Sequence, residues 1–242
     1  MKVKLENPGT LAKTIDLVSE LVTEVRLKLD ESGMSLTAID PANVAMVRFL
    51  LRKDAFTEFD LEDNEKLGVN LEDLKKILKR AGSKSTLSIE KNESSLNIEI
   101  QDRVKRKFTL GLIDIDKEEK EMPSLEFSAR VEISSTDLTN AIEDCAVVSE
   151  ACSFLIENQT FVIEAKGMNS ARSEFTGDEA TIHAEDCKSR YSLEYLQKFM
   201  KGAKMTSKIA LNFANDHPLK MDIVVENMEI NFVLAPRVET ED

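Results

Sequence analysis

The chain has no tryptophan, two histidines and eight glycines among its 242 residues. Aromatic residues make up 5% of the sequence, which leaves few rings for stacking the bases of a single-stranded nucleic acid. Neither His183 nor His217 lies in an HExxH spacing, and no GxSxG, P-loop or GxGxxG sequence occurs. We therefore expect both histidines to have structural roles and the protein not to be an enzyme.

Cysteine is scarce as well, with Cys145, Cys152 and Cys187 as its three examples. Their odd number and wide spacing argue against a disulfide framework or a zinc site, so we expect reduced thiols. No apolar run approaches the roughly 18–20 residues of a membrane span, and the first residues contain no apolar signal core. The expectation is a cytoplasmic protein (nuclear if the source is eukaryotic) that does not contact membranes and needs no cofactor or metal.

Positive charge is in deficit, because 32 Lys and Arg residues face 45 Asp and Glu residues, for a formal net charge of −13. Such a surface disfavours indiscriminate binding to nucleic acid. Any contact with DNA must therefore come from a segregated basic face. The length suits two domains of about 120 residues, each able to bury a core.

One stretch of about twenty residues occurs twice, as Asn70–Ile89 and as Ser192–Leu211. At roughly 100° per residue, each copy predicts a short amphipathic helix. The apolar faces comprise Leu71, Leu74, Ile77 and Leu78 in the first copy and Leu193, Leu196, Phe199 and Met200 in the second. Lysines lie on the opposite face at matching phases, namely Lys76 and Lys79, and Lys198 and Lys201. The repeat indicates a duplicated domain with a similar basic surface in each half.

The remaining pattern predicts the same order of elements in both halves. The expected helices are Thr10–Val25, with Thr10 as N-cap, Leu71–Arg80, Thr136–Ser149 and Leu193–Lys201. Alternating residues predict a hairpin around the turn Asp30–Gly33, another around Asn158–Gln159, and strands at Val44–Leu51, Phe56–Phe59, Leu87–Ile89, Leu96–Ile100, Phe108–Leu112, Ile209–Phe213, Met221–Val225 and Ile230–Leu234, with further strands through His183 and Tyr191. The fold class is α+β, with two helices on one face of antiparallel sheet in each domain.

A charged segment, Asp114–Ser128, separates the halves and carries eight charges in fifteen residues. Its carboxylates (Asp114, Asp116, Glu118, Glu119 and Glu121) lack EF-hand spacing and are expected to be solvated rather than to bind a metal. It also contains Met122, Pro123, Leu125 and Phe127, which gain nothing in a solvated tether unless they cover something. We expect a domain at 1–113, a connector at 114–128 and a second domain at 129–242.

The candidate DNA-binding residues are the cations on or near the helices. They are Lys13, Lys75, Lys76, Lys79, Arg80, Lys198, Lys201 and Lys204. The alternative is that the lysines only keep exposed helix faces soluble.

Three segments carry a family resemblance, and it is their occurrence together in one chain that makes it specific. GVNLEDLKKILKRAG (Gly68–Gly82), MSLTAIDPANVAMV (Met34–Val47) and LAPRVE (Leu234–Glu239) together resemble the sliding DNA clamps of the proliferating cell nuclear antigen type, most closely the archaeal members. The likeness covers essentially the whole chain. It implies a head-to-tail homotrimer around duplex DNA, with antiparallel sheets outside and helices lining the channel. Such clamps have no catalytic activity. They bind DNA without sequence preference, are loaded by a clamp loader, and tether DNA polymerase, flap endonuclease and DNA ligase.

The resemblance also implies a pocket for partner peptides that carry a glutamine and aromatic residues. Carried over by motif, that pocket comprises Ile39, Asn43, Val44, Met46, Met122, Pro123, Leu125, Phe127, Pro218, Val233, Leu234, Ala235 and Pro236. Two features depart from the family pattern. Lys120 stands where an apolar connector residue is common, and Asn140 and Glu143 stand where many relatives carry basic residues.

For the subunit contact we expect a basic edge with Arg80 and Lys84 against an acidic helix edge with Asp137, Glu143 and Asp144. Exposed ion pairs are worth only about 0–1 kcal/mol each, so edge-strand pairing and apolar packing must supply most of the interface. Two alternatives stay open. One is a subunit of a heterotrimeric or checkpoint-type clamp, and the other is an acidic α+β enzyme with a perturbed histidine in a pocket.

Overall fold

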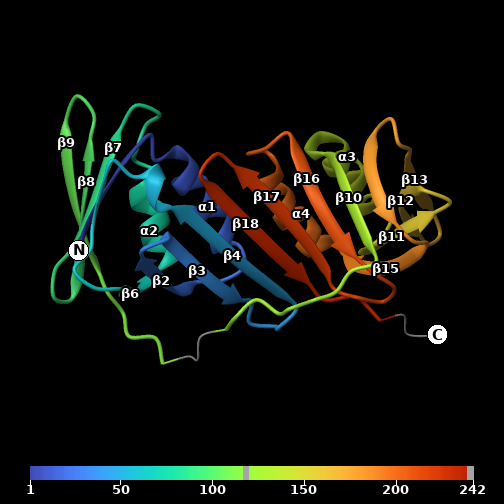
Figure 1. Cartoon of the computed structure of the whole chain (residues 1–242), viewed down its shortest axis with the longest axis horizontal. Coiled ribbons are helices and arrows are strands. Elements are labelled where there is room, and N and C mark those ends of the chain that lie inside the picture. Colours follow the sequence, from blue (N-terminus) through green and yellow to red (C-terminus); the bar gives the residue numbers. More distant parts are fainter. Residues whose placement is uncertain (117–119, 239–242) are drawn as a thin grey trace. The chain divides into compact units, whose positions relative to one another are not determined.

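The structure is a computed structural model that describes residues 1–116 and 120–238 (Figure 1). The chain divides into two compact units. Unit 1 comprises Met1–Pro41, Val47–Met122 and Glu226–Glu229, and unit 2 comprises Ala42–Met46, Pro123–Val225 and Ile230–Asp242.

Unit 1 contains two helices and two layers of antiparallel strands. Its elements are β1 (Lys2–Glu6), α1 (Gly9–Ser19), β2 (Glu24–Asp30), β3 (Gly33–Ile39), β4 (Ala45–Arg52), the 3-10 helix η1 (Lys53–Ala55), β5 (Glu58–Asp60), β6 (Glu65–Asn70), α2 (Leu71–Leu78), β7 (Thr86–Lys91), β8 (Ser95–Gln101) and β9 (Lys105–Gly111). The strand orders are β5-β1-β7-β8-β9 in one layer and β4-β3-β2-β6 in the other.

Unit 2 repeats this plan. Its elements are β10 (Ala129–Ser134), α3 (Ser135–Ala146), β11 (Ala151–Glu157), β12 (Thr160–Lys166), β13 (Ser170–Phe175), β14 (Ala180–Ala184), β15 (Cys187–Ser192), α4 (Leu193–Ala203), β16 (Lys208–Phe213), β17 (Leu219–Val225) and β18 (Met228–Leu234). The strand orders are β14-β10-β16-β17-β18 and β13-β12-β11-β15, which match those of unit 1 strand for strand. The duplication predicted from the repeated helix therefore extends to the whole topology.

The apolar stripes of the helices form the core of each unit. In unit 1, Leu11 and Ile15 of α1 and Leu74 and Leu78 of α2 enclose one apolar space with Leu27, Met34, Leu67, Ile89 and Leu96 from the strands. In unit 2, Phe154 packs edge-on against Phe161, Tyr191 and Phe213. The repeated helices thus bury the residues predicted to face inward except Ile77, which is half-buried.

Several boundaries differ from the predicted ones. The first helix ends at Ser19 rather than Val25, because Glu24 and Val25 pair with Asn70 and Val69 of β6. Thr10 is not the N-cap, since the helix begins at Gly9 and Pro8 takes the cap position without a side-chain bond. The helix predicted over Leu71–Arg80 ends at Leu78, while the fourth continues past Lys201 to Ala203.

The strands differ as well. The sequence pattern did not predict β1 and β10, which precede the first helix of each unit, and it indicated one sheet where two strand layers occur. It also placed a strand around Phe56–Phe59, whereas η1 ends at Ala55 and the short strand β5 begins at Glu58.

Candidate functional sites

The paired helices of unit 1 carry the first candidate surface, and Lys75 lies at its centre. The Nζ atom of Lys75 is 3.0 Å from the Ser19 hydroxyl, 3.1 Å from Glu72 Oε1 and 3.3 Å from Asp16 Oδ1. Its side chain is only 18% exposed. Lys75 therefore joins α2 to α1, and it is not one of the open cations that the helix pattern predicted.

The other cations of this surface are more accessible. Lys79 bonds to Asp16 at 2.9 Å and Lys76 to Asp73 at 2.9 Å, yet their side chains are 54% and 71% exposed. Lys13 and Arg80 are also exposed. The hydrogen bond from Lys79 holds the pKa of the Asp16 carboxyl below its usual value. The predicted stripe is present, but nearby carboxylates neutralise part of it.

In unit 2 the matching face is less charged. Lys198 bonds to Glu194 at 2.8 Å and lies 5.1 Å from the centre of the Tyr195 ring, with 28% of its side chain exposed. Lys201 and Lys204 are exposed, whereas the residue that corresponds to Lys75 is Gln197. The helix α3 has no basic residue, as its sequence indicated.

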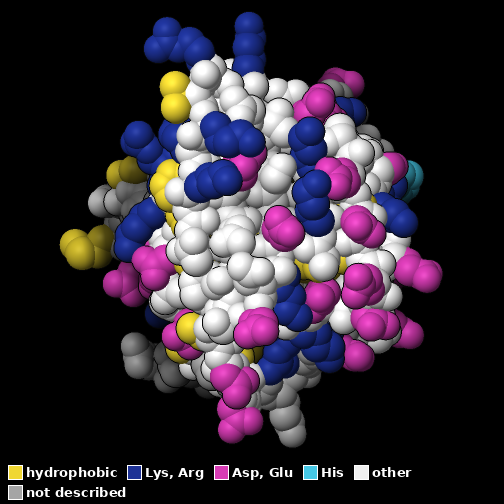
Figure 2. All heavy atoms as spheres, turned by 90° about the vertical axis from the view of Figure 1, so that its left-hand side faces the viewer, with side chains coloured by type: hydrophobic (Ala, Val, Ile, Leu, Met, Phe, Trp, Pro, Cys, Tyr) yellow, Lys and Arg dark blue, Asp and Glu magenta, His cyan; other side chains and the backbone are white. Residues whose placement is uncertain are grey.

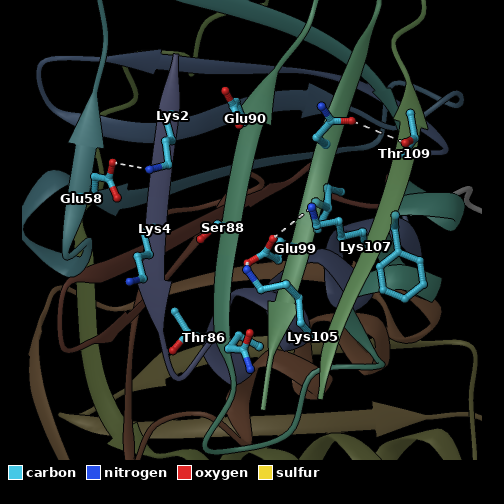
Figure 3. A pocket seen from close by; sticks show the side chains of 14 residues that line it. Lys2, Lys4, Glu58, Thr86, Ser88, Glu90, Glu99, Lys105, Lys107 and Thr109 are labelled. Carbon is cyan, nitrogen blue, oxygen red and sulfur yellow. Dashed lines mark hydrogen bonds and ion pairs between the residues drawn. The ribbon is translucent and has the colours of Figure 1, made fainter. Parts of the chain in front are cut away.

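A second basic region surrounds β9, the edge strand of its five-stranded layer within the described chain. Lys105 and Lys107 face the same side as Lys2 and Lys4 of β1, and Glu99 lies 2.8 Å from Lys105 (Figure 3). Figure 2 shows Lys and Arg side chains gathered over the upper part of this side of unit 1, and acidic side chains below and to the right. The candidate residues taken from the sequence did not include β9, although the run Lys105–Lys107 was a visible signal.

The predicted contact residues are placed on separate units. Arg80 and Lys84 are exposed in unit 1, and the Arg80 carbonyl accepts a hydrogen bond from Arg106 of β9 at 2.8 Å. On α3 of unit 2, Glu143 and Asp144 are exposed and Asp137 is half-buried. The basic post-helix segment and β9 thus form one continuous edge, which we call the β9 edge.

The predicted peptide site gathers mainly in unit 2. The Val44 carbonyl accepts a hydrogen bond from Ala235 N at 2.9 Å, so the two segments run side by side. Val44, Met46, Ala235, Pro236 and Pro218 are half-buried. Phe127 of the connector packs edge-on against His217 with ring centres 5.6 Å apart, and Leu125 is half-buried.

Other members of this set do not fit a surface pocket equally well. Leu234 is fully buried and Val233 is 7% exposed, so both support the core beneath the site rather than lining it. Asn43 is exposed with a left-handed φ of 56°, and Pro123 is exposed. Ile39 and Met122 belong to unit 1, where both are half-buried.

The first residues of the connector are pinned to unit 1. Ile113 N donates to the Gly68 carbonyl at 2.9 Å, and the Arg26 guanidinium donates to the Ile115 carbonyl. Glycine is required at position 68, because an added Cβ would lie 2.0 Å from the Ile113 oxygen. Glu118 and Glu119, two of the predicted solvated carboxylates, lie outside the described residues.

Among the residues that the structure describes, neither histidine lies in a site with converging reactive groups. His183 is exposed on β14, and the His217 carbonyl accepts hydrogen bonds from Tyr191 at 2.8 Å and Ser189 at 2.9 Å. All three cysteines are buried and reduced. Within residues 1–116 and 120–238, no group of three His, Cys, Asp or Glu side chains is arranged to hold a metal ion.

Comparison with known proteins identifies the family. Residues 1–120 match the family model of the proliferating cell nuclear antigen N-terminal domain, and residues 121–238 match that of the C-terminal domain. The chain belongs to the proliferating cell nuclear antigen family. The DNA polymerase sliding clamp of Pyrococcus furiosus is 32% identical, and the DNA polymerase sliding clamp 1 of Thermococcus kodakarensis is 34% identical, each over 98% of both chains.

Solved structures of this family share the fold. The proliferating cell nuclear antigen of Thermococcus kodakaraensis superposes with a TM-score of 0.92 at 24% identity, covering 98% of this chain and 99% of that one. The Entamoeba histolytica protein gives 0.91 at 23% identity, covering 98% of each. A proliferating cell nuclear antigen is a non-enzymatic processivity factor, and this chain is a sliding clamp of that kind. Its described helices are all too short or too polar to span a membrane.

Proposed function

We propose that three copies of this chain close head to tail into a ring around duplex DNA. The observation that carries the proposal is a pair of edge strands on matching units: β9 in unit 1 and β13 in unit 2 each end a sheet within the described chain. An unpaired strand edge is a template for pairing with another chain. Heterologous contacts of this kind form a ring when the rotation closes.

Charge supports this choice of edges. The β9 edge carries Lys105, Arg106 and Lys107 besides Arg80 and Lys84, whereas unit 2 offers Glu174 on β13 with Asp137, Glu143 and Asp144 on α3. Exposed apolar side chains lie at the adjoining turns, with Val104 57% exposed and Met168 fully exposed. Because one chain holds both a basic and an acidic edge, a homotrimer is favoured over a heterotrimeric clamp.

In the proposed ring the helix pairs face the DNA. Lys13, Lys76, Lys79, Arg80, Lys198, Lys201 and Lys204 would contact phosphates, with Lys75 acting through its contact with α1. Lysine contacts to phosphate carry no sequence information, which suits a ring that slides. Encirclement would hold the ring, so intrinsic affinity for linear DNA should be weak and reduced by salt.

We further propose that the surface beside Val44 and Ala235 receives peptides from the replication and repair enzymes, including DNA polymerase, the clamp loader, flap endonuclease and DNA ligase. The connector would begin after Ile115, whose carbonyl accepts a hydrogen bond from Arg26 of unit 1, and Leu125 and Phe127 would cover one side of the peptide. Burial of one aromatic anchor contributes roughly 1.5–3 kcal/mol. Two anchors with backbone hydrogen bonds would reach about micromolar affinity.

Light scattering followed by primer extension tests the ring. The protein should have three times the chain mass of 27.2 kDa and should lengthen the products of a polymerase supplied with a clamp loader. The Arg80→Glu/Lys84→Glu variant should shift toward monomer at low salt, whereas Arg48→Glu/Lys208→Glu should remain trimeric. A monomeric wild-type protein, or an edge variant with unchanged mass at micromolar concentration, would contradict the proposal.

A glutamine-plus-two-aromatics peptide tests the partner surface by fluorescence anisotropy. Val44→Glu should abolish binding without changing the trimer mass. Val224→Glu is the matched control, since Val224 is 58% exposed on β17. A Leu234 substitution is unsuitable, because that side chain belongs to the core. Equal affinity in the wild type and in Val44→Glu would place the peptide elsewhere.

A further inference from the structure

A small hollow lies on the four-stranded sheet of unit 2. Strand register places Arg172, Glu164, Ser153 and Arg190 in one row across β13, β12, β11 and β15. The hollow has a volume of about 240 Å³ and is lined by Ala151, Ser153, Glu164, Ala165, Lys166, Lys188 and Arg190. Ser153 is the one small side chain of this row, and it leaves room between Glu164 and Arg190.

The hollow lies on the face of the sheet away from the helices. Helix α3 packs against β11 and β12, and its Cys145 thiol interacts with that of Cys152 on β11, so α3 covers the face on which Cys152 lies. Successive residues of a strand point to opposite faces, and Ser153 therefore points away from α3. If helices line the DNA channel, this face belongs to the outer wall.

The polar groups of the hollow are unequally satisfied. Glu164 is 4% exposed and its carboxylate is held by Lys166 at 2.6 Å and Arg172 at 2.8 Å. By contrast, the guanidinium of Arg190 and the hydroxyl of Ser153 form no hydrogen bond with any residue that the structure describes. Ser153 is 8% exposed, and its hydroxyl is open to solvent, because every buried side-chain nitrogen or oxygen atom of the described residues has a partner. Three cations and one carboxylate line the space, so it carries local positive charge in an acidic protein.

The corresponding place in unit 1 shows how an arginine of this sheet can hold a carbonyl oxygen of a crossing segment. By strand register, Arg26 and Gly68 of unit 1 correspond to Ser153 and Arg190 of unit 2. There the chain itself crosses the strand, with Ile113 bonded to Gly68 and Arg26 donating to the Ile115 carbonyl. In unit 2 the corresponding crossing segment makes the same backbone bond, from Arg237 N to the Arg190 carbonyl at 2.7 Å. In unit 2 the arginine of this pair of positions is Arg190 on β15 rather than a residue of β11. Its guanidinium forms no hydrogen bond with a described residue.

We propose that this hollow receives the carboxylate of an Asp or Glu side chain from a partner protein, with Arg190 and the Ser153 hydroxyl as donors. Arginine presents a planar fork of N–H groups that matches a carboxylate, and such charge-assisted bonds are among the strongest in proteins. A polypeptide is the favoured source because the corresponding place in unit 1 already holds one, seated by an arginine. The hollow has room for one side chain but not for a run of nucleotides. The site would give the clamp a second contact with partner proteins, separate from the Val44 surface. This contact would recognise acidic segments of the partner.

Fluorescence anisotropy of the intact protein at low salt tests the proposal. The probe is a labelled decapeptide that contains three glutamates, and the same peptide with glutamines is its uncharged counterpart. Arg190→Gln should weaken binding of the glutamate peptide at least tenfold, while Arg48→Gln, the same change at an exposed site of unit 1, should not. The double variant Ser153→Arg/Arg190→Gly copies the arrangement of unit 1 and should abolish binding. Light scattering and circular dichroism verify that each variant retains its mass and fold, which separates this result from any failure of the ring.

Several outcomes would overturn the proposal. Equal affinity for the glutamate and glutamine peptides would show that no carboxylate is recognised. Equal binding by the wild type and Arg190→Gln would place the peptide elsewhere. No detectable binding of the glutamate peptide would also contradict the proposal. Displacement of the bound peptide by inorganic phosphate or a duplex oligonucleotide at lower concentration than by the unlabelled peptide would indicate a phosphate site. If Arg190→Gln fails to fold, Ser153→Arg alone fills the hollow and decides between these outcomes.

Discussion

In unit 1 the chain that leaves β9 crosses the sheet at Gly68, whereas in unit 2 the chain that leaves β18 crosses at Arg190. Both crossings use the same backbone hydrogen bond, from Ile113 N and from Arg237 N respectively. The difference lies in the side chains, because Gly68 allows close approach and Arg190 projects a guanidinium over the neighbouring strand. Duplication thus preserved the backbone pairing of the two units and left the solvent-facing side chains free to take different roles.

The helix pairs show the same division between backbone and surface. Leu71 and Leu193 occupy matching buried positions, and so do Leu74 and Leu196. On the outer faces, Lys75 of α2 bridges to Asp16 of α1, while its counterpart in α4 is Gln197. Unit 1 therefore has a polar connection between its helices that unit 2 lacks at this position.

The largest expected effect comes from adding a side chain at Gly68, where the chain crosses β6 in unit 1. Gly68→Ala would place a Cβ 2.0 Å from the Ile113 carbonyl oxygen, which belongs to the backbone and cannot move cheaply. We expect a loss of about 1–3 kcal/mol in the free energy of unfolding, measured by urea denaturation, with faster proteolysis of the connector.

Gly9→Ala is the control for this change. Nothing lies within 4 Å of the Cβ that it would add, and alanine favours the helix that begins there. Equal stability of Gly68→Ala and the wild type would mean that the crossing segment can lift from β6 without cost.

The repeated helices were the most predictable part of the fold, because four apolar residues at helical spacing recur with lysines on the opposite face. The first helix was overextended, since Leu21, Val22 and Val25 continue its apolar phase although Val25 pairs with Val69 in a sheet. The strands β1 and β10 were missed because each shows only a few buried alternating residues flanked by charge.

The candidate sites were predictable only in part. Exposure of Lys76 and Lys79 followed from helix phase, but the low exposure of Lys75 depends on where α1 packs. Likewise, the contact between Val44 and Ala235 joins segments separated by most of the chain, and only the family resemblance suggested it. The Arg190 hollow depends on strand register, which helix spacing and motif matches do not contain.

A smaller effect should distinguish the lysine faces of the two units. The variants Lys76→Ala/Lys79→Ala and Lys198→Ala/Lys201→Ala remove the same pair of charges from unit 1 and from unit 2. Each should reduce processivity and lower the salt dependence of DNA retention, by a slope of about one for each phosphate that the variant no longer binds. The unit 1 pair should have the larger effect, because Lys198 is only 28% exposed and already bonded to Glu194. Primer extension at several salt concentrations measures both effects. Unchanged processivity in both variants would mean that the lysines serve only to keep the helix faces soluble.

The smallest effect concerns the polar connection between α1 and α2. The pKa of Asp16 is lowered in the folded protein, chiefly by the hydrogen bond from Lys79 and opposed by partial burial. Its contribution to stability is therefore complete above the pKa of the unfolded carboxyl and is lost as pH falls through the lower folded value. Asp16→Asn should cost less than about 1 kcal/mol at pH 7, because the carboxyl is 41% exposed and its ion pairs are screened. In urea denaturation the difference between variant and wild type should begin to shrink at about pH 4, near the pKa of the unfolded carboxyl. It should vanish only below the lowered folded pKa, where the carboxyl is protonated in both states. Asp178→Asn, at an exposed turn of unit 2, is the control and should leave the urea denaturation curve unchanged at both pH values. A stability difference for Asp16→Asn that persists undiminished in strong acid would show that packing, not charge, joins the two helices.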